Sequence, residues 1–105
     1  MRNMKHPEME SVDLTELMYA LSDPTRVEIV LTLALAGRAM TCGELDCDRP
    51  KSSMSHHFKI LRGAGVVRTE IRGTEHINSL RLAELEKRFP GVMKAVLKVL
   101  KKGAE

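Results

Sequence analysis

Residues 50–81 constrain the fold more than any other part of this 105-residue chain. They read PKSSMSHHFKILRGAGVVRTEIRGTEHINSLR. A polar and basic helix start runs into apolar residues at helical spacing, and Gly63 ends that helix. Two runs with β-branched residues then flank a basic turn at residues 72–74, which predicts a β-hairpin. A helix followed directly by such a hairpin is typical of a helix-turn-helix reading helix and its β-wing.

The remaining elements follow from apolar spacing and from capping residues. Asp23 and Pro24 are typical of a helix start, and Thr41 with Glu44 matches a capping box. The expected strands cover residues 66–71 and 75–80. The expected helices cover residues 13–21, 24–36, 42 to 46 or 47, 50 or 51 to 62, and a last region from 82 to 102 that is interrupted at 89–91.

The predicted fold class is mostly α with a small β-hairpin, a winged helix-turn-helix that dimerises through its first and last helices. Residues 1–11 show no periodicity, so we expect a flexible N-terminal tail before a DNA-binding and dimerisation domain at 12–105. A chain this short has a limited core, and the apolar stripes of its terminal helices exceed what that core needs. The expected dimer interface contains Leu14, Leu17, Met18, Val92, Val96, Leu97 and Leu100.

Positive charge is concentrated where the reading helix and the hairpin are predicted. Residues 49–81 hold seven Lys and Arg against two Glu, whereas residues 1–48 hold four against nine Asp and Glu. The net charge of +3 conceals this asymmetry. Such a concentration is the electrostatic signature of a protein that binds a polyanion, although a solvated basic face gives the same count.

The fourth predicted helix has an apolar face and a polar face. Met54, Phe58 and Leu61 share the first, while short hydroxyl side chains edged with positive charge share the second. An ordinary amphipathic surface helix is the alternative, but the basic hairpin that follows favours DNA, because such side chains reach base edges and phosphates. The expected DNA-contact residues are Lys51, Ser52, Ser53, Ser55, His56, Lys59, Arg62, Arg68, Arg72, Thr74 and His76.

Several segments together resemble one family. ALSDPTR at residues 20–26 is similar to the opening of the ArsR/SmtB-type winged helix-turn-helix repressors. SSMSHHF at 52–58, with LRGAGVV at 61–67, resembles that family's recognition helix and its exit into the wing, and residues 73–80 resemble the wing. The resemblance covers residues 12–100. It implies a homodimeric, cytoplasmic repressor of double-stranded operator DNA that an inducer releases.

Two cysteines leave the regulation open. The family's metal sensors carry Cys-x-Cys on the third helix, whereas four residues separate Cys42 from Cys47 here. Two inert packing thiols are one interpretation. A thiol switch, or a soft metal or metalloid bound by both sulfurs, is the other. His56 and His57 are adjacent on a helix and do not chelate one ion, so His57 is expected to make a structural hydrogen bond. No cofactor is expected to be required.

Other classes of function find little support. No apolar run approaches the roughly 18 residues that cross a bilayer, and the polar N-terminus does not resemble a signal peptide, so we expect no membrane association. No Gly-rich phosphate loop, carboxylate pair or nucleophile elbow is present, which argues against an enzyme. The remaining alternative is a winged-helix module that binds an acidic protein and no DNA, but such surfaces usually expose more apolar anchors.

Overall fold

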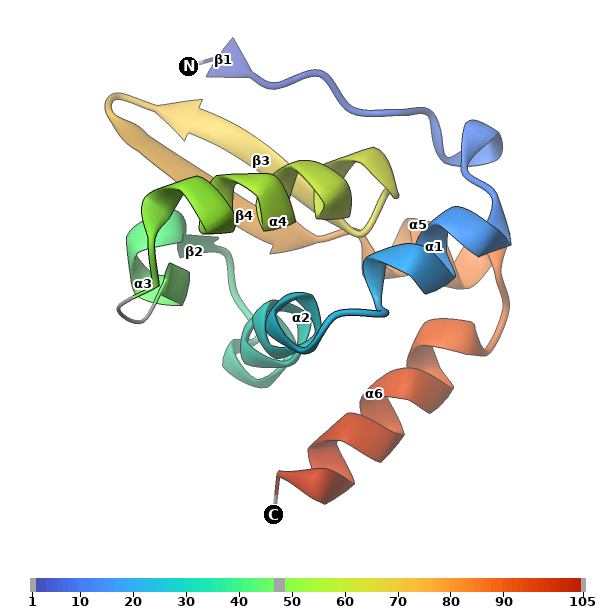
Figure 1. Cartoon of the computed structure of the whole chain (residues 1–105). Coiled ribbons are helices and arrows are strands. Elements are labelled where there is room, and N and C mark those ends of the chain that lie inside the picture. The colour runs from blue at the N-terminus through green and yellow to red at the C-terminus, as the bar shows by residue number, and fades with distance from the viewer. Residues whose placement is uncertain (1, 47–48, 105) are drawn as a thin grey trace.

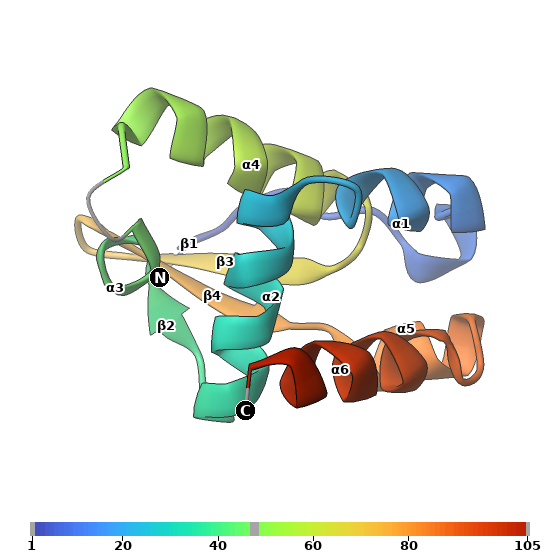
Figure 2. The ribbon, with the colours of Figure 1, turned by 60° about the horizontal axis from the view of Figure 1, so that its bottom comes forward.

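The computed structural model describes residues 2–46 and 49–104, and a small antiparallel sheet packs among helices in it (Figures 1 and 2). Helix α4 lies along the sheet in both views, and α6 ends away from it. The elements are β1 (Arg2–Asn3), the 3-10 helix η1 (Met9–Ser11), α1 (Leu14–Ala20), α2 (Pro24–Ala36), β2 (Met40–Thr41), α3 (Cys42–Asp46), α4 (Lys51–Gly63), β3 (Val67–Arg72), β4 (Glu75–Leu80), α5 (Leu82–Arg88) and α6 (Val92–Gly103).

The predicted helix ends are confirmed by their capping contacts. The Asp23 carboxylate accepts hydrogen bonds from the amides of Thr25, at 2.8 Å, and Arg26, at 3.3 Å, which starts α2. Gly37 ends that helix with φ at 64°, a conformation that favours glycine. Thr41 and Glu44 exchange hydrogen bonds of 2.9 and 3.1 Å, so the capping box at α3 forms as predicted.

The wing is a hairpin of β3 and β4, which pair from Val67 opposite Leu80 to Arg72 opposite Glu75. The sheet order is β1-β3-β4-β2, so two further strands flank the predicted hairpin. Sequence periodicity did not reveal β1 and β2, because strands of two residues are too short to show alternation.

A buried polar cluster holds the sheet together. Asn78 is fully buried on β4, and its Oδ1 accepts a hydrogen bond of 2.7 Å from the Thr69 hydroxyl on β3. Its Nδ2 donates to the Met40 carbonyl of β2, at 3.3 Å. Because buried polar groups that lose their partners are costly, this cluster fixes β2 against the hairpin.

The N-terminal segment differs from the predicted flexible tail. Residues 2 and 3 pair with β3, and the side chain of Met9 is buried in the core. The thioether of Met9 lies over Gly65, where an added Cβ would come within 3.2 Å of Met9 Cε. Sequence periodicity gave no sign of this packing, because a single buried methionine creates no repeat.

Candidate nucleic-acid interface

Helix α4 presents the predicted polar face to solvent. Met54, Phe58 and Leu61 are buried on its other side. The side chains that the sequence assigned to DNA on the first two and a half turns are exposed together, namely Lys51, Ser52, Ser53, Ser55, His56 and Lys59. A helix that exposes short hydroxyl groups and cations along one face can approach base edges closely and also meet phosphates.

The wing turn lies close to the start of α4. Arg72 and Thr74 are exposed at this turn, and His76 is half-buried on β4. An Nη atom of Arg72 lies 3.7 Å from a carboxylate oxygen of Glu70 on the same strand. The structure therefore gathers the predicted residues of the helix start and of the wing turn at one end of the molecule (Figure 1).

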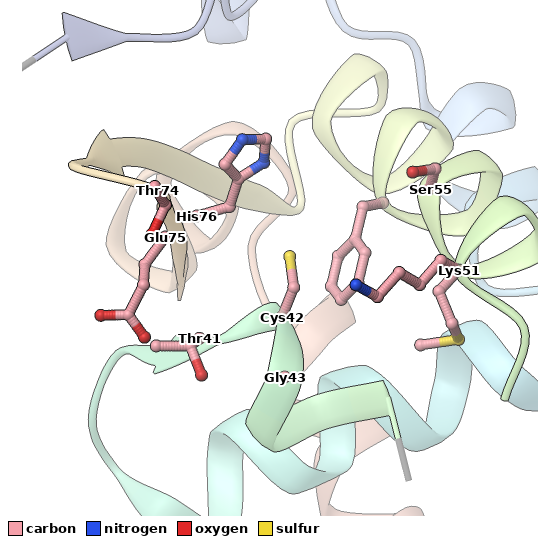
Figure 3. Close-up of a pocket in the computed structure, with 10 residues that line it drawn as sticks. Thr41, Cys42, Gly43, Lys51, Ser55, Thr74, Glu75 and His76 are labelled. Carbon is pink, nitrogen blue, oxygen red and sulfur yellow. The ribbon is translucent and has the colours of Figure 1, made fainter. Parts of the chain in front are cut away.

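A pocket of about 420 Å³ separates the wing turn from α3 and α4 (Figure 3). Lys51 and Ser55 border it from α4, Thr74 and His76 border it from the wing, and the sulfur of Cys42 points into it. Thr41 and Glu75 also line the pocket, although sequence reasoning did not select them. Because four elements, β2, α3, α4 and the wing, form its walls, the pocket depends on how the wing sits against α4.

Two predicted DNA-contact arginines lie apart from this end. Arg68 makes an ion pair of 3.2 Å with Glu84 of α5, at the base of the wing. Arg62 lies about 16 Å along α4 from Lys51, as eleven residues of helix require. Partial burial lowers the pKa of Arg62, an effect that the nearby Cys42 opposes. Neither residue joins the cluster at the wing turn.

The histidine next to His56 has the structural role expected of it. Arg26 is buried, and its Nη1 lies 3.2 Å from Nδ1 of His57. Because a guanidinium can only donate, Nδ1 of His57 is the acceptor. Arg26 also donates to the carbonyls of Ala20, at 2.8 Å, and Tyr19, at 3.1 Å, and so joins α1, α2 and α4.

One of the two predicted sensing cysteines can be placed. Cys42 is half-buried at the start of α3, and its Sγ accepts a hydrogen bond of 3.3 Å from Nδ2 of Asn78. Cys47 lies outside the described residues. Within residues 2–46 and 49–104, no group of three or more His, Cys, Asp and Glu side chains is placed to hold a metal ion.

The predicted dimer residues divide into two groups. Leu14 and Met18 on α1 are 46% and 42% exposed, and Val92, Val96 and Leu100 on α6 are half-buried. Leu17 and Leu97 are instead buried in the core of this chain, where Leu17 is fully buried. The predicted stripe therefore faces solvent at its edges and packs inward at its centre, and its place in a dimer interface stays a prediction.

Comparison with known proteins identifies the class. A family model described as a helix-turn-helix domain matches residues 21–70, from the end of α1 into β3. The HTH-type transcriptional regulator YceK of Bacillus subtilis is 34% identical over 83 residues, which are 77% of this chain and 83% of YceK. The chain belongs to the family of helix-turn-helix transcriptional regulators, which are DNA-binding proteins and not enzymes.

Two solved structures place the fold within that class. The ArsR family transcriptional regulator RHA00566 matches with a TM-score of 0.64 at 21% identity, over 96% of this chain and 98% of that protein. The transcriptional repressor BigR from Xylella fastidiosa matches with a TM-score of 0.57 at 24% identity, over 72% of this chain and 85% of BigR. The winged helix-turn-helix fold predicted from the sequence is confirmed. No helix in the described ranges is long and apolar enough to cross a bilayer.

Proposed function

We propose that this regulator is a cytoplasmic homodimeric repressor that binds double-stranded operator DNA through α4 and the wing turn. The observation that carries the proposal is the joint exposure of the α4 polar face and the wing turn at one end of the molecule. In this arrangement Ser55, His56 and Lys59 reach base edges in the major groove. Arg72 and Thr74 of the wing contact the flanking phosphates.

The exposed apolar side chains of α1 and α6 support a dimer. Leu14, Met18 and Tyr19 are exposed on α1, and Val99 on α6 is 70% exposed. Water contact with several large apolar groups is unfavourable, and a two-fold interface removes it from both protomers at once. A dimer of this kind places two α4 helices in successive major grooves, so the operator is an inverted repeat with half-sites about one helical turn apart.

The test is titration of DNA from the protein's own upstream region, followed by fluorescence anisotropy at several salt concentrations. We expect specific binding by a dimer, and protection of two symmetric half-sites in a footprint. Sedimentation that shows only the 11.8 kDa chain at micromolar concentration contradicts the dimer. A single asymmetric half-site contradicts the two-fold arrangement. Absence of DNA binding, with capture of an acidic protein partner, supports the protein-interaction alternative.

We also propose that release from DNA involves Cys42 and Cys47, through thiol modification or a soft metal. Support comes from the hydrogen bond between the Cys42 sulfur and Asn78, because Asn78 joins both strands of the wing to β2. A change at the sulfur therefore reaches the wing through one side chain. The test compares DNA affinity of the wild type with that of Cys42→Ser/Cys47→Ser, each with and without oxidant or a soft metal. An equal response of both proteins contradicts a cysteine switch.

A further inference from the structure

The N-terminal segment forms an additional strand on the outer edge of the wing. Arg2 pairs with Ile71 and Asn3 with Glu70, in antiparallel register. The Met4 amide continues this pairing with the Thr69 carbonyl, at 3.5 Å. Figures 1 and 2 show β1 beside the hairpin, toward the end where the wing turn lies. The wing edge that β3 would otherwise expose is therefore covered by this chain's own arm.

Specific contacts anchor the arm along its length. The Thr69 amide donates to Nε2 of His6 at 2.9 Å, and Nη1 of Arg81 donates to the Pro7 carbonyl at 3.0 Å. Met9 then enters the core against Gly65. These contacts tie the arm to β3, to the start of α5 and to the core, so the register of β1 on β3 is defined by more than strand pairing.

The basic and the acidic residues of the arm lie at opposite ends of it. Arg2 pairs opposite Ile71, next to the wing turn, whereas Lys5 lies further toward the base of the wing, and the side chain of Lys5 is exposed. Glu8 and Glu10 lie at the other end, where η1 packs against α5. The basic residues of the arm therefore follow the outer edge of the wing, whose tip carries Arg72 and along which a DNA backbone passes in the proposed complex.

We propose that residues 2–6 act as a third strand of the wing that contacts the DNA backbone along the outer edge of the wing, and that His6 holds this arm in place only while its Nε2 is unprotonated. The first half of the proposal rests on the proposed DNA-binding function. The second half concerns the protein alone, because Nε2 can accept the Thr69 hydrogen bond only in the neutral ring.

The surroundings of His6 favour its neutral form. Partial burial lowers the pKa of His6, and the charges of Arg68 on β3, Arg81 before α5 and Arg62 on α4 lower it further, against a smaller opposing effect of the Met4 backbone. Glu84 pairs with Arg68 and Arg81 and so reduces their effect. Because the folded pKa is below 6.5, docking of the arm is fully supported above that pH. This stabilisation of the docked arm is lost as the pH falls through the pKa of His6 in the folded protein.

Amide hydrogen exchange at Thr69 tests the anchor without DNA. At pH 7.5 we expect His6→Leu to exchange this amide about tenfold faster than the wild type, as loss of one hydrogen bond implies. His6→Gln offers an acceptor at a similar position and no titration. Its exchange should therefore match the wild type at pH 7.5 and be slower than the wild type once the pH is below the folded pKa of His6. Equal exchange in wild type and His6→Leu at pH 7.5 overturns the anchor. Equal exchange of wild type and His6→Gln over the whole acidic range in which the protein stays folded overturns the acid release.

DNA affinity measured across salt concentrations tests the contact. We expect Lys5→Gln to reduce the salt slope by about 1, and His6→Leu to weaken binding severalfold at pH 7.5. Lys101→Gln at the end of α6 is the matched control and should change neither quantity. If the wild type binds DNA and both arm variants behave like the control, the DNA contact is overturned while the proposed function stands. If the wild type does not bind DNA, the DNA contact of the arm and the proposed function fail together. Exchange of the Thr69 amide then still tests whether His6 anchors the arm.

Discussion

Cationic side chains serve different purposes in two regions of this molecule. At the wing turn and on α4, Lys51, Lys59 and Arg72 are exposed to solvent. In the interior, Arg26 and Arg81 are 4% and 6% exposed and donate to backbone carbonyls and a carboxylate. The comparison shows that positive charge in the sequence does not by itself identify a binding surface. Arg68 and Arg81 contributed to the basic count of residues 49–81, yet both bind Glu84.

The largest effect should come from the buried region. Arg26→Met removes a buried donor that serves two backbone carbonyls and Nδ1 of His57. We expect a loss of about 3 kcal/mol in the free energy of unfolding, measured by urea denaturation. Arg49→Met is the matched control, because Arg49 pairs with Glu28 at the surface, and we expect less than about 1 kcal/mol there. Similar losses in both variants would remove the distinction between the two regions.

The next effect should come from Asn78, which connects the regions. Asn78→Leu keeps the size of the side chain but leaves the Met40 carbonyl and the Thr69 hydroxyl without their partner. We expect a loss of about 2 kcal/mol in stability and weaker DNA binding, because β2 and the wing lose their common anchor. A double-mutant cycle with Thr69→Val should give a coupling of about 1 kcal/mol. Additive effects would show that the two side chains act separately.

At the exposed surface of α4, Lys59→Gln should weaken DNA binding and leave the stability of the protein almost unchanged. We expect a change of less than about 0.5 kcal/mol in stability, because the ammonium is in water. We expect DNA affinity to fall about tenfold and the salt slope to fall by about 1, because one phosphate or base contact is lost. Anisotropy and urea denaturation on the same preparation measure both quantities. A stability loss as large as that of Arg26→Met would place Lys59 in the structural group.

The smallest effect should be that of Arg68→Gln. Its ion pair with Glu84 is partly exposed, so we expect less than about 0.5 kcal/mol in stability. We also expect a salt slope close to that of the wild type, because Arg68 lies at the base of the wing and its charge is already paired. A reduction of the slope by a full unit would return Arg68 to the DNA-contact residues that the sequence predicts.

The sequence could predict the parts of the fold that depend on local rules. The helix at 24–36, the capping box at Thr41 and the hairpin at 67–80 each have a spacing or a capping residue that identifies them. It could not predict contacts between distant segments. Met9 over Gly65 and His6 against Thr69 join residues more than 50 positions apart, and neither has a periodic signal.

The same limit applied to the site. Helical geometry was enough to group Ser55, His56 and Lys59 on one face of α4. Strand geometry was not enough to separate Arg68 from Arg72, because residues four positions apart in a strand lie on the same face. Their difference depends on Glu84, which only the packing of α5 brings within 3.2 Å of Arg68. The division of Leu14 from Leu17 depended likewise on which side of α1 meets the core.

An NMR titration of the protein with its operator tests DNA contact through α4 and the wing turn directly, because the spectra follow the backbone amides one by one. DNA contact through α4 and the wing turn predicts the largest shifts at residues 51–59 and 72–76, and small shifts along α6. The exposed lysines of α6, Lys94, Lys98, Lys101 and Lys102, provide the rival cationic surface. Large shifts confined to α6, with residues 51–59 unaffected, would contradict DNA contact through α4 and the wing turn.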